Sequence, residues 1–172
     1  MSLLSRLFAK REDPREDMRP LWHRVVEISR QPGWYAQSGV ADSVAGRFDM
    51  ITAILSLVLI RMEQDAEDRT SPVFLTELFV EDMDGQLREA GIGDVVVGKH
   101  IGKLMSVLGG RLGAYRSALQ DVSNPTALAD AAARNLTLVE GTDPAQVAAT
   151  LRQFEQTLAA TDLAALKMGR ID

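Results

Sequence analysis

Apolar and polar side chains alternate along most of this chain with the period of an α-helix. The clearest case lies near the C-terminus, where Val147, Leu151, Phe154 and Leu158 recur at intervals of four, three and four residues. This spacing places them on one helical face, which favours packing on the rest of the domain, with a seam for a partner helix as the alternative. The pattern predicts helices over residues 18–30, 41–66, 72–90, 95–121, 125–139 and 144–168.

Helix start and stop signals support these boundaries. Three good N-capping residues stand directly before a proline, which suits the first helical turn because its missing N–H is not needed there. These pairs are Ser71-Pro72, Asn124-Pro125 and Asp143-Pro144. Gly91 and Gly141 each follow a predicted helix and mark its C-terminal end. The last helix is expected to break near Thr161-Asp162, which would cap a final short turn.

The remaining segments are connectors. Residues 31–40 contain Pro and Gly, and we expect them to be irregular with one turn around Trp34. The sequence has no convincing strand pattern. It therefore predicts an all-α fold, a single helical domain of about six helices with an Ala-rich C-terminal helical extension. The predicted parts are a flexible or amphipathic N-terminal segment (1–17), the helical domain (18–123) and the extension packed on it (124–172).

The composition agrees with this fold and excludes several classes of function. Apolar residues make up 46% of the chain and aromatic residues only 5%, a balance that favours helices over a β-sandwich. The formal net charge of −5 argues against general nucleic-acid binding, which needs a basic surface. Because the chain has no cysteine, a disulfide framework, a structural zinc site and a thiol nucleophile are excluded.

We expect the protein to be cytoplasmic. The N-terminus lacks the long apolar stretch and the small-residue cleavage site of a secretory signal. The longest apolar run, residues 50–60, is shorter than the roughly 20 residues that cross a bilayer, so we interpret it as a buried helix. Leu3, Leu4, Leu7 and Phe8 are interspersed with basic residues. A helix there would lie on an anionic membrane surface; the alternative is a frayed terminus.

No residue pattern points to catalysis or to a metal. His23 and His100 lack a carboxylate at the Glu-x-x-His spacing of di-iron bundles, and no Gly-x-Ser-x-Gly elbow is present. The acidic run 81–84 would hold Mg²⁺ and a diphosphate only together with a second such motif. A solvated face on which Asp84 pairs with Arg88 is favoured instead. We expect no enzyme activity, no metal and no cofactor, haem included.

Two pairs of glycines are four residues apart on one predicted helix: Gly98/Gly102 and Gly109/Gly113. Each pair leaves a strip of the helix surface without side chains. A glycine weakens a helix by up to about 1 kcal/mol relative to alanine, so close approach of another backbone is the expected compensation. The neighbour is either a helix of the same chain or a segment of another protein.

The segment 46–49, Gly-Arg-Phe-Asp, brings two charges to the start of the apolar run. Buried charge without a partner is costly, so these groups must be paired. We expect Arg47 to form a structural ion pair with an acidic residue of helix 72–90, with Glu81 or Asp82 favoured. Direct contact with a ligand is the alternative.

Several short segments form an ordered set over roughly residues 20–121. In chain order they are Trp34-Tyr35, 39–43, 46–50, 79–84, 87–89, 91–94, 99–105, Gly110-Arg111 and Ala114-Tyr115. No single piece is specific, but the set with these spacings resembles the ubiquinol-cytochrome c chaperone family in its bacterial form. The Ala-rich segment after Asn124 lies outside the resemblance.

The resemblance implies a helical, non-enzymatic assembly chaperone for the respiratory ubiquinol-cytochrome c reductase, the cytochrome bc complex. By similarity, the chain would bind newly made cytochrome b, or an assembly intermediate, at the cytoplasmic face of a bacterial inner membrane. It also implies a small partner protein and the ribosome as partners. Peripheral membrane contact is expected from the N-terminal segment, and no nucleic-acid partner is expected from the net charge. The matching positions, which either bind the partner or hold the fold, are Trp34, Tyr35, Arg47, Asp49, Asp82, Asp84, Arg88, Asp94, Lys99, Lys103, Arg111 and Tyr115.

The chain departs from the family pattern at two places. Family members often carry an aromatic pair before the last Gly-Arg motif, where this chain has residues 107–109, Val-Leu-Gly. Many also carry a histidine within the apolar helix, where this chain has Ala53-Ile54. Two alternative functions are a helical adaptor with another membrane or ribosomal client, and a quinone- or isoprenoid-binding protein. A deep apolar pocket would favour the latter, and an exposed apolar groove would favour the chaperone or the adaptor.

Overall fold

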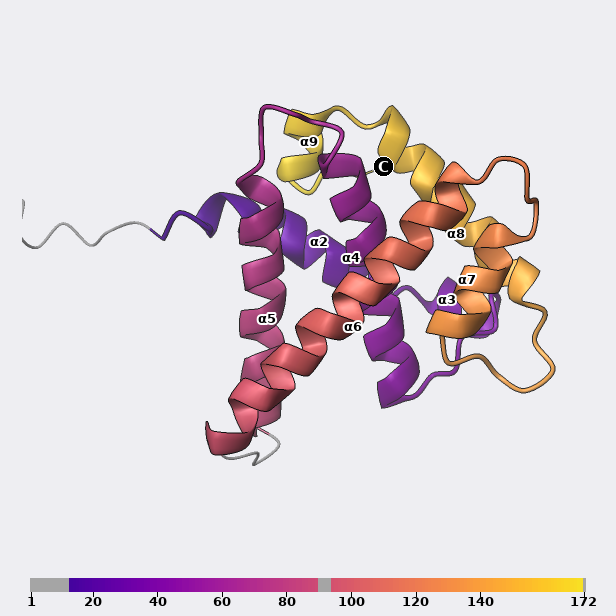
Figure 1. Ribbon diagram of the computed structural model, residues 1–172, viewed down its shortest axis with the longest axis horizontal. Helices are drawn as coiled ribbons and strands as arrows, with labels where there is room; N and C mark the ends of the chain where they lie inside the picture. The colour runs from indigo at the N-terminus through magenta and orange to yellow at the C-terminus, as the bar shows by residue number, and fades with distance from the viewer. Residues whose placement is uncertain (1–12, 90–93, 172) are drawn as a thin grey trace, which may run out of the picture.

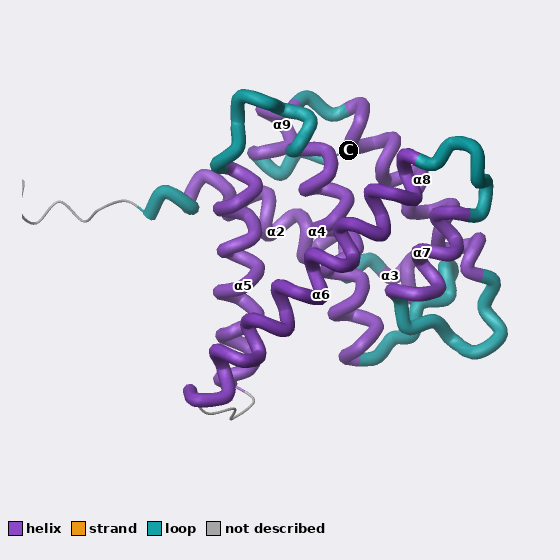
Figure 2. Tube along the Cα trace, viewed as in Figure 1, coloured by secondary structure: helices purple, strands orange, loops and turns teal. Residues whose placement is uncertain are grey.

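The computed structural model describes residues 13–89 and 94–171, with the backbone alone at Leu87 and residues 94–99. This part of the chain is helical with short connecting loops (Figures 1 and 2), which confirms the all-α prediction. The elements in chain order are η1 (Glu16–Met18), α2 (Arg19–Ser29), α3 (Pro32–Ala36), α4 (Val44–Met62), α5 (Ser71–Glu89), α6 (Asp94–Gln120), α7 (Ala127–Asn135), α8 (Pro144–Ala160) and α9 (Leu163–Lys167).

Helix α4 forms the centre of the core. Every residue from Asp49 to Leu59 is buried, and α4 packs against α2, α5, α6 and α8. A helix that is apolar on all sides is stable only where neighbours cover it completely. The run 50–60 is therefore a buried helix, as predicted.

None of the described helices is both long enough and apolar enough to cross a membrane.

The other helices surround α4. Helices α5 and α6 lie side by side, and α6 crosses α4 on the side nearest the viewer in Figure 1. Helices α7 and α8 pack against each other, and α7 contacts α6 while α8 contacts α4. The stripe predicted on α8 is an internal packing face, since Val147, Leu151 and Leu158 are fully buried. The chain returns to α2 at its end, where the Ile171 carbonyl accepts a hydrogen bond from Arg24 at 2.7 Å.

The helix boundaries follow the local signals in part. Asp143 caps α8 through the Ala145 N–H, and Asp162 caps α9, as predicted. The Asn124 side chain instead accepts from the backbone of Thr126 in a turn before α7 begins, so the expected cap there is wrong. Helix α5 begins at Ser71 itself, whose N–H donates to the Asp68 carboxylate.

The helix predicted over 125–139 ends early, at Asn135. The following residues are extended, because Leu138 forms an isolated antiparallel bridge with Val40. Gly141 is therefore not the C-terminal end of a helix; it lies in a turn with a φ of 82°. The predicted turn around Trp34 is confirmed as helix α3, and the predicted stop at Gly91 lies outside the described residues.

Gly46 permits a close approach at the start of α4. A Cβ built there would lie 2.0 Å from the carbonyl oxygen of Ala41, whereas at Gly102 of α6 it would meet nothing within 4 Å. We predict that Gly46→Ala lowers the free energy of unfolding by about 1–3 kcal/mol through overpacking. Gly102→Ala should raise it by up to about 1 kcal/mol, because helix propensity alone acts there. Urea unfolding followed by circular dichroism measures both; equal effects would contradict the close approach at Gly46.

Asp68 lies in the loop before α5 and links this loop to helix α9. Its carboxylate accepts hydrogen bonds from Lys167 and Ser71, which hold the pKa of Asp68 well below its usual range. Because the folded-state pKa is depressed, this stabilisation is complete above the unfolded pKa of about 3.9 and is lost as pH falls below it. We predict that Asp68→Asn lowers the Tm at pH 7 and reduces the loss of Tm between pH 5 and pH 3. In thermal unfolding, Glu140→Gln, a change at an exposed position, should leave the wild-type pH dependence in place.

Candidate functional site

The predicted site residues include a buried ion pair at the centre of the fold. Arg111 of α6 pairs with Asp49 of α4, and both side chains are largely buried. The second carboxylate oxygen of Asp49 accepts from the Thr137 N–H at 2.8 Å and from its hydroxyl at 2.7 Å. Arg111 also donates to the Thr52 hydroxyl. This network joins α4, α6 and the segment after α7, so its first role is to hold the fold.

The other charge of the same segment lies on the surface. Arg47 is 60% exposed and pairs with Asp42, in the loop before α4, at 2.7 Å. The expected pairing of Arg47 with Glu81 or Asp82 is therefore wrong, and Glu81 instead pairs with Arg15 and Arg19. The physical reason is helix geometry. Side chains two positions apart on a helix point in nearly opposite directions, so Arg47 points outward because Asp49 points inward.

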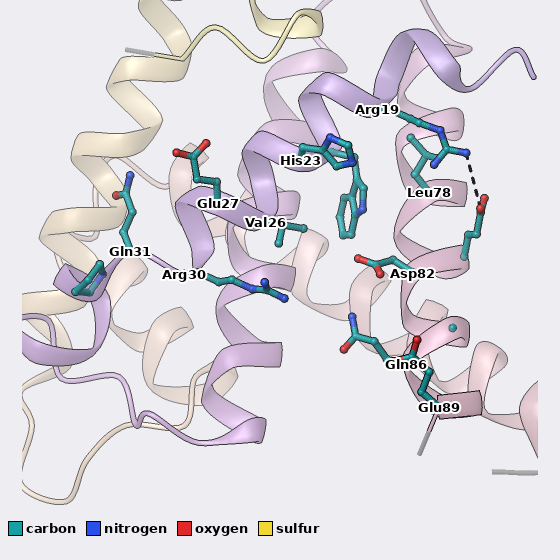
Figure 3. Close-up of a pocket in the computed structure, with 14 residues that line it drawn as sticks. Arg19, His23, Val26, Glu27, Arg30, Gln31, Leu78, Asp82, Gln86 and Glu89 are labelled. Carbon is teal, nitrogen blue, oxygen red and sulfur yellow. Dashed lines mark ion pairs between the residues drawn. The ribbon is translucent and has the colours of Figure 1, made fainter. Parts of the chain in front are cut away.

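A groove of about 990 Å³ runs between α2 and α5 (Figure 3). Arg30, at the end of α2, points across it toward Asp82 and Gln86 of α5. One end of the groove is bounded by the Arg19–Glu81 ion pair at 3.8 Å. The α2/α5 groove is lined by Arg19, Trp22, His23, Val26, Glu27, Arg30, Gln31, Pro32, Leu78, Glu81, Asp82, Gly85, Gln86 and Glu89.

A second hollow of about 720 Å³ adjoins this groove, because Arg30 and Gln86 line both. It lies between the start of α4 and the first half of α6, with α5 beside it. The α4/α6 hollow is lined by Arg30, Val44, Arg47, Phe48, Ile51, Met83, Gln86, His100, Lys103, Leu104 and Val107.

The two parts of this surface differ in charge. The α2/α5 groove has both signs, since four carboxylates and two arginines line it. Among the described residues that line the α4/α6 hollow there is no carboxylate, and its charged members are Arg30, Arg47 and Lys103. Most of the remaining lining is apolar. The surface as a whole can therefore bind a polypeptide that carries apolar side chains and charges together.

Five of the predicted positions make contacts that hold the fold. Asp49 and Arg111 form the central ion pair. The Trp34 indole donates to the Ile28 carbonyl at 2.8 Å, and the Tyr35 hydroxyl donates to the Ser29 carbonyl at 2.7 Å. Tyr115 is fully buried, and burial raises the pKa of its hydroxyl. These residues fix α3 on α2 and α6 on α4, so their direct structural role is in the fold.

The other predicted positions whose side chains are described lie at or near the surface. Asp82 lines the α2/α5 groove, while Arg47 and Lys103 line the α4/α6 hollow. Asp84 and Arg88 form the expected pair along α5 at 2.8 Å. The side chains of Asp94 and Lys99 lie outside the described residues.

The glycines of α6 do not pack as expected. A Cβ at Gly102, Gly109 or Gly113 would meet nothing within 4 Å, so the expected close packing against a helix of this chain is wrong for these three. The surroundings of Gly98 lie outside the described residues.

Within the described part of the chain, no group of three or more acidic or histidine side chains is placed to hold a metal ion. The α2/α5 groove and the α4/α6 hollow form an open, partly apolar face on an all-helical protein. Comparisons with known proteins identify the family. The model of the ubiquinol-cytochrome C chaperone family matches residues 36–171. The chain therefore belongs to that family.

One solved structure is similar over nearly the whole chain. It is the crystal structure of the Cbp3 homolog from Brucella abortus, with a TM-score of 0.76 and 33% sequence identity over 91% of this chain and 87% of that one. The family match includes α7 to α9. It therefore extends beyond residues 20–121, the range over which the short sequence motifs resemble the family. No match was found among curated proteins.

The central ion pair generates a stability prediction. Removing one partner of a buried pair leaves the other charge buried without compensation, at a cost of about 3–5 kcal/mol. We therefore expect Asp49→Leu and Arg111→Leu each to lower the free energy of unfolding by that amount. The double variant should lose less than the sum, since it leaves neither charge uncompensated. Urea unfolding of the wild type, the two single variants and the double variant measures the coupling free energy between the two side chains.

An exposed ion pair provides the control for this double-mutant cycle. Arg116 and Glu63 pair at 2.7 Å but remain more than a third exposed, so Arg116→Leu should cost less than about 1 kcal/mol. Additive losses at positions 49 and 111 would mean that the two side chains do not depend on each other.

Proposed function

We propose that this chain is an assembly chaperone for ubiquinol-cytochrome c reductase, the cytochrome bc complex. In this proposal it binds newly made cytochrome b, or an assembly intermediate that contains it. Membership of the ubiquinol-cytochrome C chaperone family supports the general role. The similarity to the Cbp3 homolog over most of both chains supports it further.

The observation that carries the proposal is the continuous surface made by the α2/α5 groove and the α4/α6 hollow. A chaperone for a membrane protein must cover apolar side chains for a time and then release them, which requires an open apolar surface with charged margins. The groove and hollow together have this composition. A quinone or isoprenoid carrier would instead need an enclosed cavity that buries most of its ligand, and both parts of this surface open to solvent.

The proposal includes a place of action. Cytochrome b inserts into the membrane, so the chaperone would work beside the inner face of the cytoplasmic membrane without spanning it. The N-terminal segment 1–17 would supply a peripheral contact, because its basic and apolar residues suit an anionic lipid surface. Residues 1–12 lie outside the described part of the chain.

Gene deletion in the source organism tests this function. We expect the deletion strain to lose assembled cytochrome bc complex, measured by native gel electrophoresis and by the haem b absorbance of isolated membranes. The wild-type gene should restore it. Asp82→Lys, which reverses a charge in the α2/α5 groove, should restore less of it because opposite charge at the groove disfavours the same client.

A matched charge reversal provides the control. Glu140→Lys makes the same change of charge at an exposed position outside the groove and the hollow, and it should restore the complex fully. A normal amount of complex in the deletion strain would refute the proposal. If the tagged chain co-purified with another membrane or ribosomal protein and not with cytochrome b, the adaptor alternative would replace it.

A further inference from the structure

The floor of the α4/α6 hollow is apolar and comes from three helices. Phe48 and Ile51 belong to α4, Met83 to α5, and Leu104 and Val107 to α6. Ile51 and Met83 are only 7% and 6% exposed and form the deepest part, while the other three are half-buried around them. The hollow thus offers a recessed apolar strip that nothing in the described chain covers.

The described charged residues that line this strip are all basic. Arg30 stands at the end of α2, Lys103 on α6 and Arg47 in the first turn of α4, where it also pairs with Asp42 at 2.7 Å. This asymmetry is local, because the whole chain has a net charge of −5. The apolar depression on another face of α5 and α6 has the reverse pattern: Glu63, Glu77, Glu81 and Asp84 line it, and Arg15 is the single cation among the described residues of its lining.

We propose that the α4/α6 hollow binds an amphipathic helix of the client, with its apolar ridge on the floor and carboxylates beside that ridge. The proposal rests on the proposed chaperone function and names the kind of segment recognised. Apolar side chains at helical spacing would fill the strip, as in other helix-in-groove complexes. Carboxylates at the margins would meet Arg30, Arg47 and Lys103, and arginine binds carboxylate with two parallel hydrogen bonds.

A helix fits this hollow better than an extended segment or a lipid surface. An extended peptide needs a strand edge for its backbone hydrogen bonds, and the described residues form only the isolated bridge between Val40 and Leu138. A helix satisfies its own backbone groups. A membrane surface is flat, so it would touch the charged edges but leave the recessed Ile51 and Met83 uncovered.

Peptide binding tests the inference. Overlapping fluorescent peptides that cover the cytochrome b of the source organism are titrated with the full chain, and binding is followed by anisotropy. We expect the tightest peptides to be helix-forming segments with acidic residues beside an apolar face. The double variant Arg47→Glu/Lys103→Glu should weaken their binding by about tenfold or more, and added salt should weaken wild-type binding in the same direction.

The control variant makes the same change of net charge elsewhere. Arg69→Glu/Arg134→Glu alters two exposed arginines that line neither the groove nor the hollow, and it should bind the peptides as the wild type does. Circular dichroism melting of both variants confirms that they are folded. A floor variant, Val107→Ser, should weaken binding without changing its dependence on salt.

Three results would overturn the inference. These are peptide binding that is equal in the Arg47→Glu/Lys103→Glu and control variants, a preference for basic peptides, and binding of anionic phospholipid vesicles but of no peptide.

Co-purification of cytochrome b with the tagged chain separates the two proposals. If the wild type and the hollow variant retain cytochrome b equally, the chaperone function stands and the hollow is not its site. If the wild type retains no cytochrome b, the chaperone function itself fails.

Discussion

The fold depends on the buried ion pair between Asp49 and Arg111. Two charges inside a helical core are stable only when each is fully paired, and here Thr137 and Thr52 supply the additional hydrogen bonds. Because these four residues come from α4, α6 and the segment after α7, the network fixes three parts of the chain relative to one another. Arg111 also lies over the Phe48 ring, 5.4 Å from its centre, so the same contact positions part of the hollow's floor.

The helices could be predicted from sequence because their signals are local. The apolar period located α2, α4, α5, α6 and α8, and the aspartates before α8 and α9 act as caps. The two failures have different causes. Asn124 had the residue type of a cap, but its side chain accepts from Thr126 in a local turn that competes with the cap. The residues after Asn135 become extended because Val40 is available as a partner for Leu138, a distant contact that no local pattern contains.

The candidate site was predictable only in part, for a similar reason. The motif positions combine residues that hold the fold, such as Trp34 and Tyr115, with residues that line the α4/α6 hollow, such as Arg47 and Lys103. Sequence order does not separate these groups. The floor of the hollow was missed entirely because each of its helices contributes one or two ordinary apolar residues. Val107, noted in the sequence only as a departure from the family's aromatic pair, is one of them.

The segment from Gly46 to Asp49 explains how one short motif serves both the fold and the surface. Successive residues of an α-helix point about 100° apart, so four in a row face four directions. Gly46 lies against the Ala41 backbone, Arg47 stands at the edge of the hollow, Phe48 lines its floor, and Asp49 reaches the buried Arg111. A change at position 47 therefore alters the surface, while a change at 46 or 49 alters the fold. Loss of function in the latter variants would say nothing about the client.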